Sequence, residues 1–307
     1  MTATKAKISP QFKELSITQA QKVKLSKHPS DYKAHEVKKA GKKKAHLIAG
    51  DILEQSRSAL IAAHEKLWAC KKYGVLIVLQ GMDTAGKDGT IRHILSGINP
   101  QGCRVAGFKV PTTEEHSHNF LWRYQKEVPA RGEVVIFNRS HYEDVLAVKV
   151  HPEYMEQLPE ELSFKKNKKF WDSRYEDINA FEHHLARNGI LVLKFFLHIS
   201  KDEQKNRLLE RLTLEEKYWK ISPADLKERQ FWEQYSSAYE DLLSQTGHEY
   251  APWIIVPAND KKIARAIIAN IIADAINGLD IDFPKLTAEA IQELKLAKVA
   301  LEKEPNL

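Results

Sequence analysis

The chain has 307 residues, a hydrophobic fraction of 43% and a charged fraction of 29%, values typical of a globular protein with a sizeable core. It contains only two cysteines, Cys70 and Cys103, which excludes a disulfide framework and predicts a reducing, cytoplasmic location. The sequence shows no signal-peptide pattern and no apolar run long enough to span a bilayer, so we expect no membrane partner.

The positive charge is concentrated near the N-terminus. Residues 1–46 carry twelve lysines and three acids, a net +9, so the whole-chain value of +6 leaves −3 for the remaining 261 residues. We therefore expect a basic N-terminal arm over 1–46, which either binds polyanions or only keeps the terminus solvated. Residues 1–30 have little periodicity, and we expect them to be loose or draped over the body.

A helix is predicted over 45–72, with an apolar face made of Leu47, Ile48, Ile52, Leu60, Ile61 and Leu67. An apolar run without alternation follows over 75–79, typical of a strand buried on both faces. The spacing G-x-x-x-x-G-K comes next, and a helical apolar stripe follows it. Strand, glycine loop and helix in this order predict a P-loop, whose backbone N–H groups and helix N-terminus bind phosphate. We expect phosphate contacts from Gly81, Met82, Thr84, Ala85, Gly86, Lys87, Asp88 and Gly89.

Two positions of this loop are irregular. Asp88 replaces the Ser or Thr that usually follows the lysine, and Asp83 places a carboxylate where it would repel phosphate. An acid there is explained by a cation between it and the phosphates, or by a role in preparing the attacking group. We therefore expect phosphoryl transfer with Asp83 and Lys87 as catalytic residues.

A second strand is predicted over 104–110 and a helix over 111–127, on which Arg123 is a candidate for the nucleotide side. A third strand over 132–137 ends at Asn138 and Arg139. In P-loop folds this position normally carries an acid for Mg²⁺, so Asn138 would be a neutral ligand. Metal binding is then expected to shift toward Asp83, with Glu143 or Asp144 as a further ligand.

The second half alternates in the same way. We expect a helix over 170–188, a strand over 190–199 and a helix that begins with a capping box at Ser200 and Glu203. Basic residues occur on this helix and in the segment that connects it to the next helix. The pattern predicts either a lid over about 207–225 that closes over a phosphate-bearing substrate, or a solvated helical hairpin. These candidate phosphate-binding residues are Arg207, Arg211, Lys217 and Lys220.

A fifth strand over 253–256 and a helix over 260–276 complete the body. This order predicts an α/β P-loop kinase fold, with a five-stranded parallel sheet flanked by helices and a helical lid. We expect three regions: the arm (1–46), a phosphotransferase domain (47–278) and a C-terminal tail (279–307) with one amphipathic helix.

Three phrases resemble one family. The phrases GMDTAGKDGT, FLWRYQKEVPARGEVVIFNRSHYEDVL and EKYWKISPADLKERQFWEQY, followed by APWIIVPA, are similar to polyphosphate kinase family 2 over roughly 47–278. The resemblance implies a thymidylate-kinase-like fold and transfer of a terminal phosphate between inorganic polyphosphate and a nucleotide, with Mg²⁺ or Mn²⁺. It also implies that Asp83, Lys87 and Arg139 are catalytic.

Where this chain has Asn138, many members have Asp. The variant Asn-Arg-Ser-x-Tyr-Glu-Asp resembles the class III subgroup, which phosphorylates both AMP and ADP, the latter to ATP. The metal candidates are Asp83, Asn138 and Glu143. We also expect a homo-oligomer, a dimer or a tetramer.

Two alternatives remain open. An ATP-dependent nucleoside monophosphate kinase would share the loop and the fold. A nucleotide-binding switch or nucleic-acid-binding module would use the basic arm, although we do not expect nucleic acid as a partner.

Overall fold

In the computed structural model, which describes residues 3–32, 35–155 and 168–304, five parallel strands form the centre of the molecule. Their order across the sheet is β6-β5-β2-β4-β3, so the strand that precedes the P-loop lies in the middle. All eight residues of that strand are buried, because helices cover both faces of the sheet. The predicted α/β P-loop kinase fold is confirmed. The strands are β2 (Gly74–Gly81), β3 (Cys103–Gly107), β4 (Val134–Asn138), β5 (Ile190–His198) and β6 (Trp253–Pro257).

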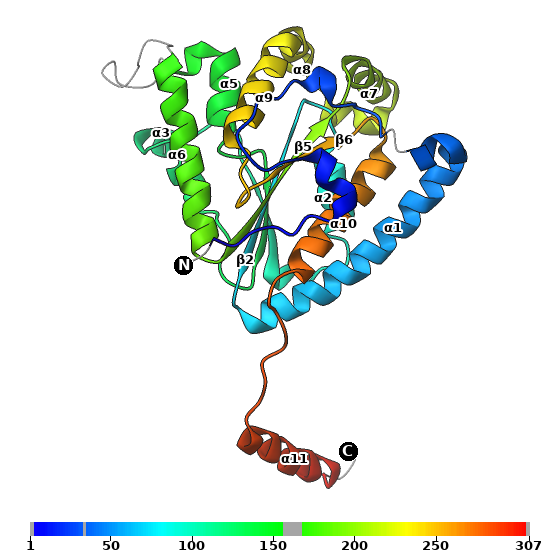
Figure 1. Ribbon diagram of the computed structural model, residues 1–307, viewed down its shortest axis with the longest axis vertical. Coiled ribbons are helices and arrows are strands. Elements are labelled where there is room, and N and C mark those ends of the chain that lie inside the picture. Colours follow the sequence, from blue (N-terminus) through cyan, green and yellow to red (C-terminus); the bar gives the residue numbers. More distant parts are fainter. Residues whose placement is uncertain (1–2, 33–34, 156–167, 305–307) are drawn as a thin grey trace.

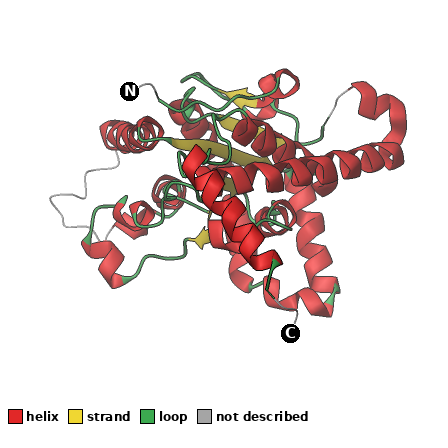
Figure 2. Cartoon of the chain, turned by 90° about the horizontal axis from the view of Figure 1, so that it is seen from below, coloured by secondary structure: helices red, strands yellow, loops and turns green. Residues whose placement is uncertain are grey.

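The helices form a layer on each face of the sheet (Figures 1 and 2). One layer consists of α1 (His35–Cys70), α2 (Lys87–Ile94) and α10 (Lys261–Asn277). The other consists of α5 (Glu143–Val150), α6 (Lys168–Arg187) and α9 (Trp232–Thr246). The connections between strands also carry the helices α3 (Thr113–Ser117), α4 (Trp122–Gln125), α7 (Lys201–Thr213) and α8 (Pro223–Glu228).

The N-terminal segment is packed against the body, so of the two expected arrangements, loose or draped over the body, the structure shows the second. Strand β1 (Ser16–Ile17) pairs antiparallel with β6 and adds a sixth strand at that edge of the sheet. Four apolar side chains anchor the segment in the core, at irregular spacing that no periodicity analysis detects: Phe12, Ile17, Val23 and Leu25. The segment therefore covers a sheet edge that would otherwise be open.

Two predicted helices differ from the observed ones. Helix α1 begins ten residues earlier than predicted, and Gly41 interrupts it with a φ of 77°. Its inward face contains Leu60 and Leu67 as predicted, but Leu47 is 65% exposed and the small Ala45 and Ala49 are buried instead. The helix predicted over 111–127 is divided into α3 and α4, because the Asn119 side chain accepts the Leu121 N–H in a turn between them.

The C-terminal helix α11 (Ala288–Glu302) projects away from the body in Figure 1. None of its residues is buried, and its exposed apolar side chains are Ile291, Leu294, Leu296, Val299 and Leu301. Among the helices of the described residues, none has the length and apolarity needed to cross a bilayer.

Candidate active site

The P-loop and the end of β4 meet at a crevice on the carboxyl edge of the sheet. β2 and β4 are neighbours, and Leu79 pairs with Asn138. After β2 the chain enters α2 on one face, and after β4 it enters α5 on the opposite face. Parallel sheets bind ligands where successive connections diverge in this way.

The loop itself adopts an anion-binding shape. A Cβ at Gly81 would lie 2.9 Å from the Leu197 carbonyl oxygen, so glycine is required for the close approach of β5. Thr84 and Gly86 have positive φ values of 65° and 105°, an arrangement that lets successive N–H groups surround an anion. The Thr84 hydroxyl is buried and has no partner among the described residues, as expected of a group that awaits a ligand.

Four charged side chains converge beside the loop. The Lys87 Nζ donates to the Gly81 carbonyl at 2.7 Å, and an Arg139 Nη2 lies 3.6 Å from the Asp83 Oδ1. Burial lowers the pKa of Lys87, although Asp83 opposes the shift. Burial likewise raises the pKa of Glu143, against the opposing effect of Arg139 and Lys87. Burial disfavours the charged form of Arg139, but the carboxylates of Glu143 and Asp83 outweigh it and raise its pKa.

This cluster forms one end of a cavity of about 1030 Å³. The cavity extends from Asp83 and Lys87 past α5 to the segment around α3 and α4, and its wall also includes residues of α6 and α9. A volume of this size exceeds the usual range for one drug-sized ligand. The site can therefore accommodate two phosphate-bearing molecules.

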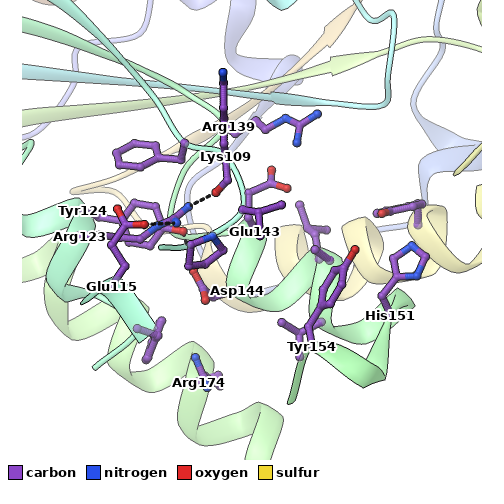
Figure 3. Close-up of a pocket in the computed structure, with 18 of the residues that line it drawn as sticks. Lys109, Glu115, Arg123, Tyr124, Arg139, Glu143, Asp144, His151, Tyr154 and Arg174 are labelled. Carbon is purple, nitrogen blue, oxygen red and sulfur yellow. Dashed lines mark hydrogen bonds and ion pairs between the residues drawn. The ribbon is translucent and has the colours of Figure 1, made fainter. Parts of the chain in front are cut away.

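A second group of polar residues lies at the far end of the cavity (Figure 3). Arg123 donates to Glu115 at 3.2 Å and to the Lys109 carbonyl at 2.9 Å, and its guanidinium lies over the Tyr124 ring. The Tyr124 hydroxyl donates to Asp144 at 2.6 Å. Burial raises the pKa of Asp144, and this hydrogen bond opposes the shift.

Comparison with known protein families decides which class of P-loop protein this site belongs to. The sequence model of the family Polyphosphate kinase 2 (PPK2) matches residues 48–284. The chain belongs to the polyphosphate kinase 2 family.

Relatives and solved structures agree with this family. The chain is 47% identical over 246 residues to an "ADP-polyphosphate phosphotransferase" of Rhodopseudomonas palustris, covering 80% of this chain and 84% of that protein. It is 44% identical over 257 residues to an "AMP/ADP-polyphosphate phosphotransferase" of Meiothermus ruber, covering 84% of this chain and 89% of the relative. The crystal structure of polyphosphate kinase 2 from Arthrobacter aurescens superposes with a TM-score of 0.82 at 36% identity, covering 97% of this chain and 100% of that one.

In this polyphosphate kinase 2 protein, two residues that depart from the usual P-loop pattern, Asp88 and Asn138, contact each other. The Asn138 Nδ2 donates to the Asp88 Oδ1 at 2.8 Å. A P-loop usually has a hydroxyl on the helix and a carboxylate on the strand. Here the carboxylate lies on the helix and an amide lies on the strand. The side chains at the two positions are still hydrogen-bonded, but the negative charge is on the helix instead of the strand.

The oxygen donors at this end of the cavity fit a hard divalent cation. Asp83 and Glu143 line the cavity and supply carboxylates. Asn138 is not part of the wall but precedes Arg139, which is, and its amide oxygen is available to a cation because its nitrogen donates to Asp88. Across the described ranges, no group of three or more His, Cys, Asp or Glu side chains has the geometry of a metal site. That is compatible with Mg²⁺, which in kinases takes one or two carboxylates and completes its shell with phosphate and water.

The structure separates the predicted lid residues from the cavity. Arg211 donates to the Lys220 carbonyl at 2.8 Å, and Lys217 pairs with Glu210 at 2.6 Å, both within the lid. Neither these three residues nor Arg207 contribute to the cavity wall. Arg207 is buried, and α7 begins with only half of the predicted capping box, because the Glu203 carboxylate turns to Arg207.

Sequence reasoning missed several residues of the wall. Arg229, Tyr235 and Tyr239 reach the cavity from the segment after the lid, and Arg174 reaches it from α6. Arg229 lies within one of the sequence motifs that carry the family resemblance, so that motif could have identified it as a site residue. Arg174 lies on the helix predicted over 170–188, where nothing in the spacing distinguishes it from a solvated charge.

Proposed function

We propose that this polyphosphate-dependent nucleotide phosphotransferase transfers the terminal phosphate of inorganic polyphosphate to both AMP and ADP, reversibly. One observation carries the proposal: a single cavity has Lys87 and Arg139 at one end and Arg123 and Arg174 at the other. Two cationic ends suit two phosphate-bearing substrates that meet between them. The names of the relatives from R. palustris and M. ruber support ADP and AMP as acceptors.

In the proposed reaction an oxygen of the acceptor phosphate attacks the terminal phosphorus of polyphosphate. The bond to the bridging oxygen breaks, and the shortened polyphosphate leaves as the anion. The acceptor oxygen is already ionised at neutral pH, so the site needs alignment and charge neutralisation more than a strong base. We assign neutralisation to Lys87, Arg139 and the loop N–H groups, and assign orientation of the acceptor to Asp83.

We propose Asp83, Asn138 and Glu143 as the residues that hold Mg²⁺ or Mn²⁺. When bound, the cation neutralises phosphate charge and helps to align donor with acceptor. Of the two carboxylates in this set, Asp83 is the less obstructed, since burial raises the pKa of Glu143.

We assign the far end of the cavity to the nucleoside. His118 stacks on Trp122 with ring centroids 3.9 Å apart, and Arg174 lies 4.0 Å from the centroid of the Phe120 ring. Flat aromatic and guanidinium surfaces of this kind bind nucleobases by stacking. Arg211, Lys217 and Lys220, on the outer lid, are assigned to the polyphosphate chain beyond the cavity.

The decisive experiment compares donors. AMP or ADP is incubated with Mg²⁺ and either polyphosphate or ATP, and the nucleotides are separated by chromatography. We expect ADP from AMP and ATP from ADP when polyphosphate is the donor. Phosphorylation of AMP from ATP alone would instead identify a nucleoside monophosphate kinase. Binding of RNA in preference to polyphosphate would favour the nucleic-acid alternative.

We further propose a homo-oligomer, a dimer or a tetramer, in the cytoplasm. The exposed apolar side chains of α11 support association of copies, because an isolated amphipathic surface of this kind is costly in water. The free thiols of Cys70 and Cys103 support a reducing compartment. Light scattering of the full chain and of residues 1–286 measures the number of chains in the assembly. The same number in both would show that α11 is not needed for association.

A further inference from the structure

The side chain of Arg207 uses all of its hydrogen-bond donors within the protein. Its Nη1 donates to the carbonyls of Thr84 and Ala85, both at 2.9 Å. Its Nη2 donates to the carbonyls of Ala258 at 2.6 Å and Asn259 at 3.0 Å. Its Nε donates to the Glu203 carboxylate at 2.6 Å. A guanidinium has five N–H groups, and these five acceptors engage all of them, with the residue only 4% exposed.

A second residue of α7 holds the preceding part of the loop. The Gln204 Nε2 donates to the Asp83 carbonyl at 3.1 Å, and its Oε1 accepts from an Arg229 Nη1 at 2.6 Å. Gln204 is as deeply buried as Arg207. Three consecutive carbonyls of the P-loop, those of residues 83, 84 and 85, are thus fixed from one helix.

Fixing these carbonyls also fixes the N–H groups of the loop. In a trans peptide the N–H points opposite to the C=O, so the N–H groups of Thr84 and Gly86 are directed away from α7. Thr84 is β-branched and occupies the left-handed region with a φ of 65°, which is unfavourable for such a residue. Conformations of this kind persist only where surrounding contacts hold them, and the α7 hydrogen bonds are such contacts.

We propose that Arg207, with Gln204, is a positioning residue that holds the P-loop in its anion-binding conformation and contacts no phosphate itself. This inference rests on the proposed phosphotransfer, because the loop is taken to bind the reacting phosphates. Arg207 was expected from the sequence to bind phosphate, and the inference gives it a positioning role instead. The remaining cations at the loop, Lys87 and Arg139, bind the phosphates.

The experiment compares Arg207→Met with Arg211→Met, which changes the same residue type one turn later on α7. Binding of polyphosphate is measured against NaCl concentration, and kcat is measured at saturating substrates. A side chain that contacts a phosphate contributes about 0.7–0.9 to the slope of log Kd against log salt, by analogy with nucleic acids. We expect Arg211→Met, at a residue assigned to the polyphosphate chain, to lose such a contribution to the slope. Arg207→Met should keep the slope and lose roughly 100-fold in kcat, the usual effect of about 1 Å of misplacement.

Arg207→Lys tests the inference if the methionine variant fails to fold. Lysine keeps the charge but has three donors for five acceptors, so we expect a kcat loss nearly as large as for methionine. A lysine variant with wild-type kcat would show that only the charge matters and would overturn the inference. A reduced salt slope in either Arg207 variant would also overturn it. A wild-type protein that binds polyphosphate but transfers nothing would refute the proposed function, while the slopes still test the role of Arg207.

Discussion

The Asn138 amide donates to the Asp88 carboxylate across the gap between β4 and α2, at 2.8 Å. This contact places the carboxylate on the helix and the neutral partner on the strand, the reverse of the usual P-loop arrangement.

Asn138→Asp should impair the enzyme because it opposes two carboxylates at hydrogen-bond distance. One of the two would be protonated or displaced at neutral pH, and we expect a loss of roughly ten-fold or more in kcat/KM. Adding Asp88→Thr to the same chain removes the repulsion and should recover most of the loss. The single and double variants are compared by initial rates with polyphosphate and ADP. A single variant as active as the wild type would show that the pairing has no role.

Asp83→Asn should remove activity without unfolding the chain. The carboxylate faces Arg139 and the cavity, so its loss leaves no buried charge unpaired in the core. We expect kcat to fall roughly 100-fold or more, the scale of losing one preorganised electrostatic contact. Thermal unfolding measured in parallel should give an unchanged Tm. Activity close to that of the wild type, at that Tm, would refute the role assigned to Asp83.

Glu143→Gln should raise stability and lower activity. Burial raises the pKa of Glu143 in the folded protein above the ordinary 4.5, so between these two pKa values the unfolded chain binds fewer protons than the folded one. Ionisation of Glu143 therefore favours unfolding, and a neutral glutamine removes that cost. We expect a higher Tm at pH 7 and a smaller gain at lower pH, where the wild-type carboxyl is protonated in both states. The acid limb of the wild-type rate profile should lie above pH 4.5 and be absent from the variant.

Replacing one partner of the buried ion pair Lys194–Glu182 should lower the free energy of unfolding strongly. The Lys194 Nζ lies 2.6 Å from Glu182, both side chains are fully buried, and Glu182 also accepts from Tyr142 at 2.7 Å. Although burial alone would raise it, the neighbouring Lys194 lowers the pKa of Glu182, so its stabilising charge is lost only in acid. Glu182→Gln should cost about 3–5 kcal/mol, because it leaves an unpaired buried ammonium. Urea unfolding should show that adding Lys194→Met recovers part of this loss, and strict additivity would contradict the coupling.

The basic arm requires substitutions rather than deletions, because part of it belongs to the core. Phe12→Ala should destabilise the protein by about 3–5 kcal/mol, since the ring is only 6% exposed. The exposed Lys42, Lys43 and Lys44 can be replaced by glutamine with little effect on folding. If the arm binds polyphosphate, this triple change should weaken the binding of long polyphosphate more than the binding of short polyphosphate. If the variant and the wild type bind long polyphosphate equally well in a competition assay, the lysines only keep the segment solvated.

The features predicted correctly are those encoded within a few residues. The strand before the P-loop, its glycines and Lys87 lie in one segment, so spacing alone predicts the sequence of strand, loop and helix that the structure has. The role of Arg207 depends on carbonyls more than 120 positions away in sequence, and an arginine on a helix carries no mark of such partners. The same holds for Arg174, which lines the cavity wall with its guanidinium over the Phe120 ring, more than 50 positions away in sequence.

Strand β1 shows a different limit. Two residues are too few for any periodicity, and their pairing depends on β6 at the other end of the chain. The division of the helix over 111–127 depended on one Asn side chain that satisfies a backbone N–H locally.

The pairing of Ser16 with Ile254 has a consequence for biosynthesis. Strand β1 is synthesised long before its neighbour β6, so it cannot pair until the residues between the two strands have been made. At about 5–20 residues per second, that interval lasts roughly 12–50 s. During this time Phe12 and Ile17 have no finished core to enter, and a nascent chain that stops before β6 keeps them exposed. The N-terminal segment is thus buried only after β6 has been made, and until then it stays accessible to proteases and chaperones.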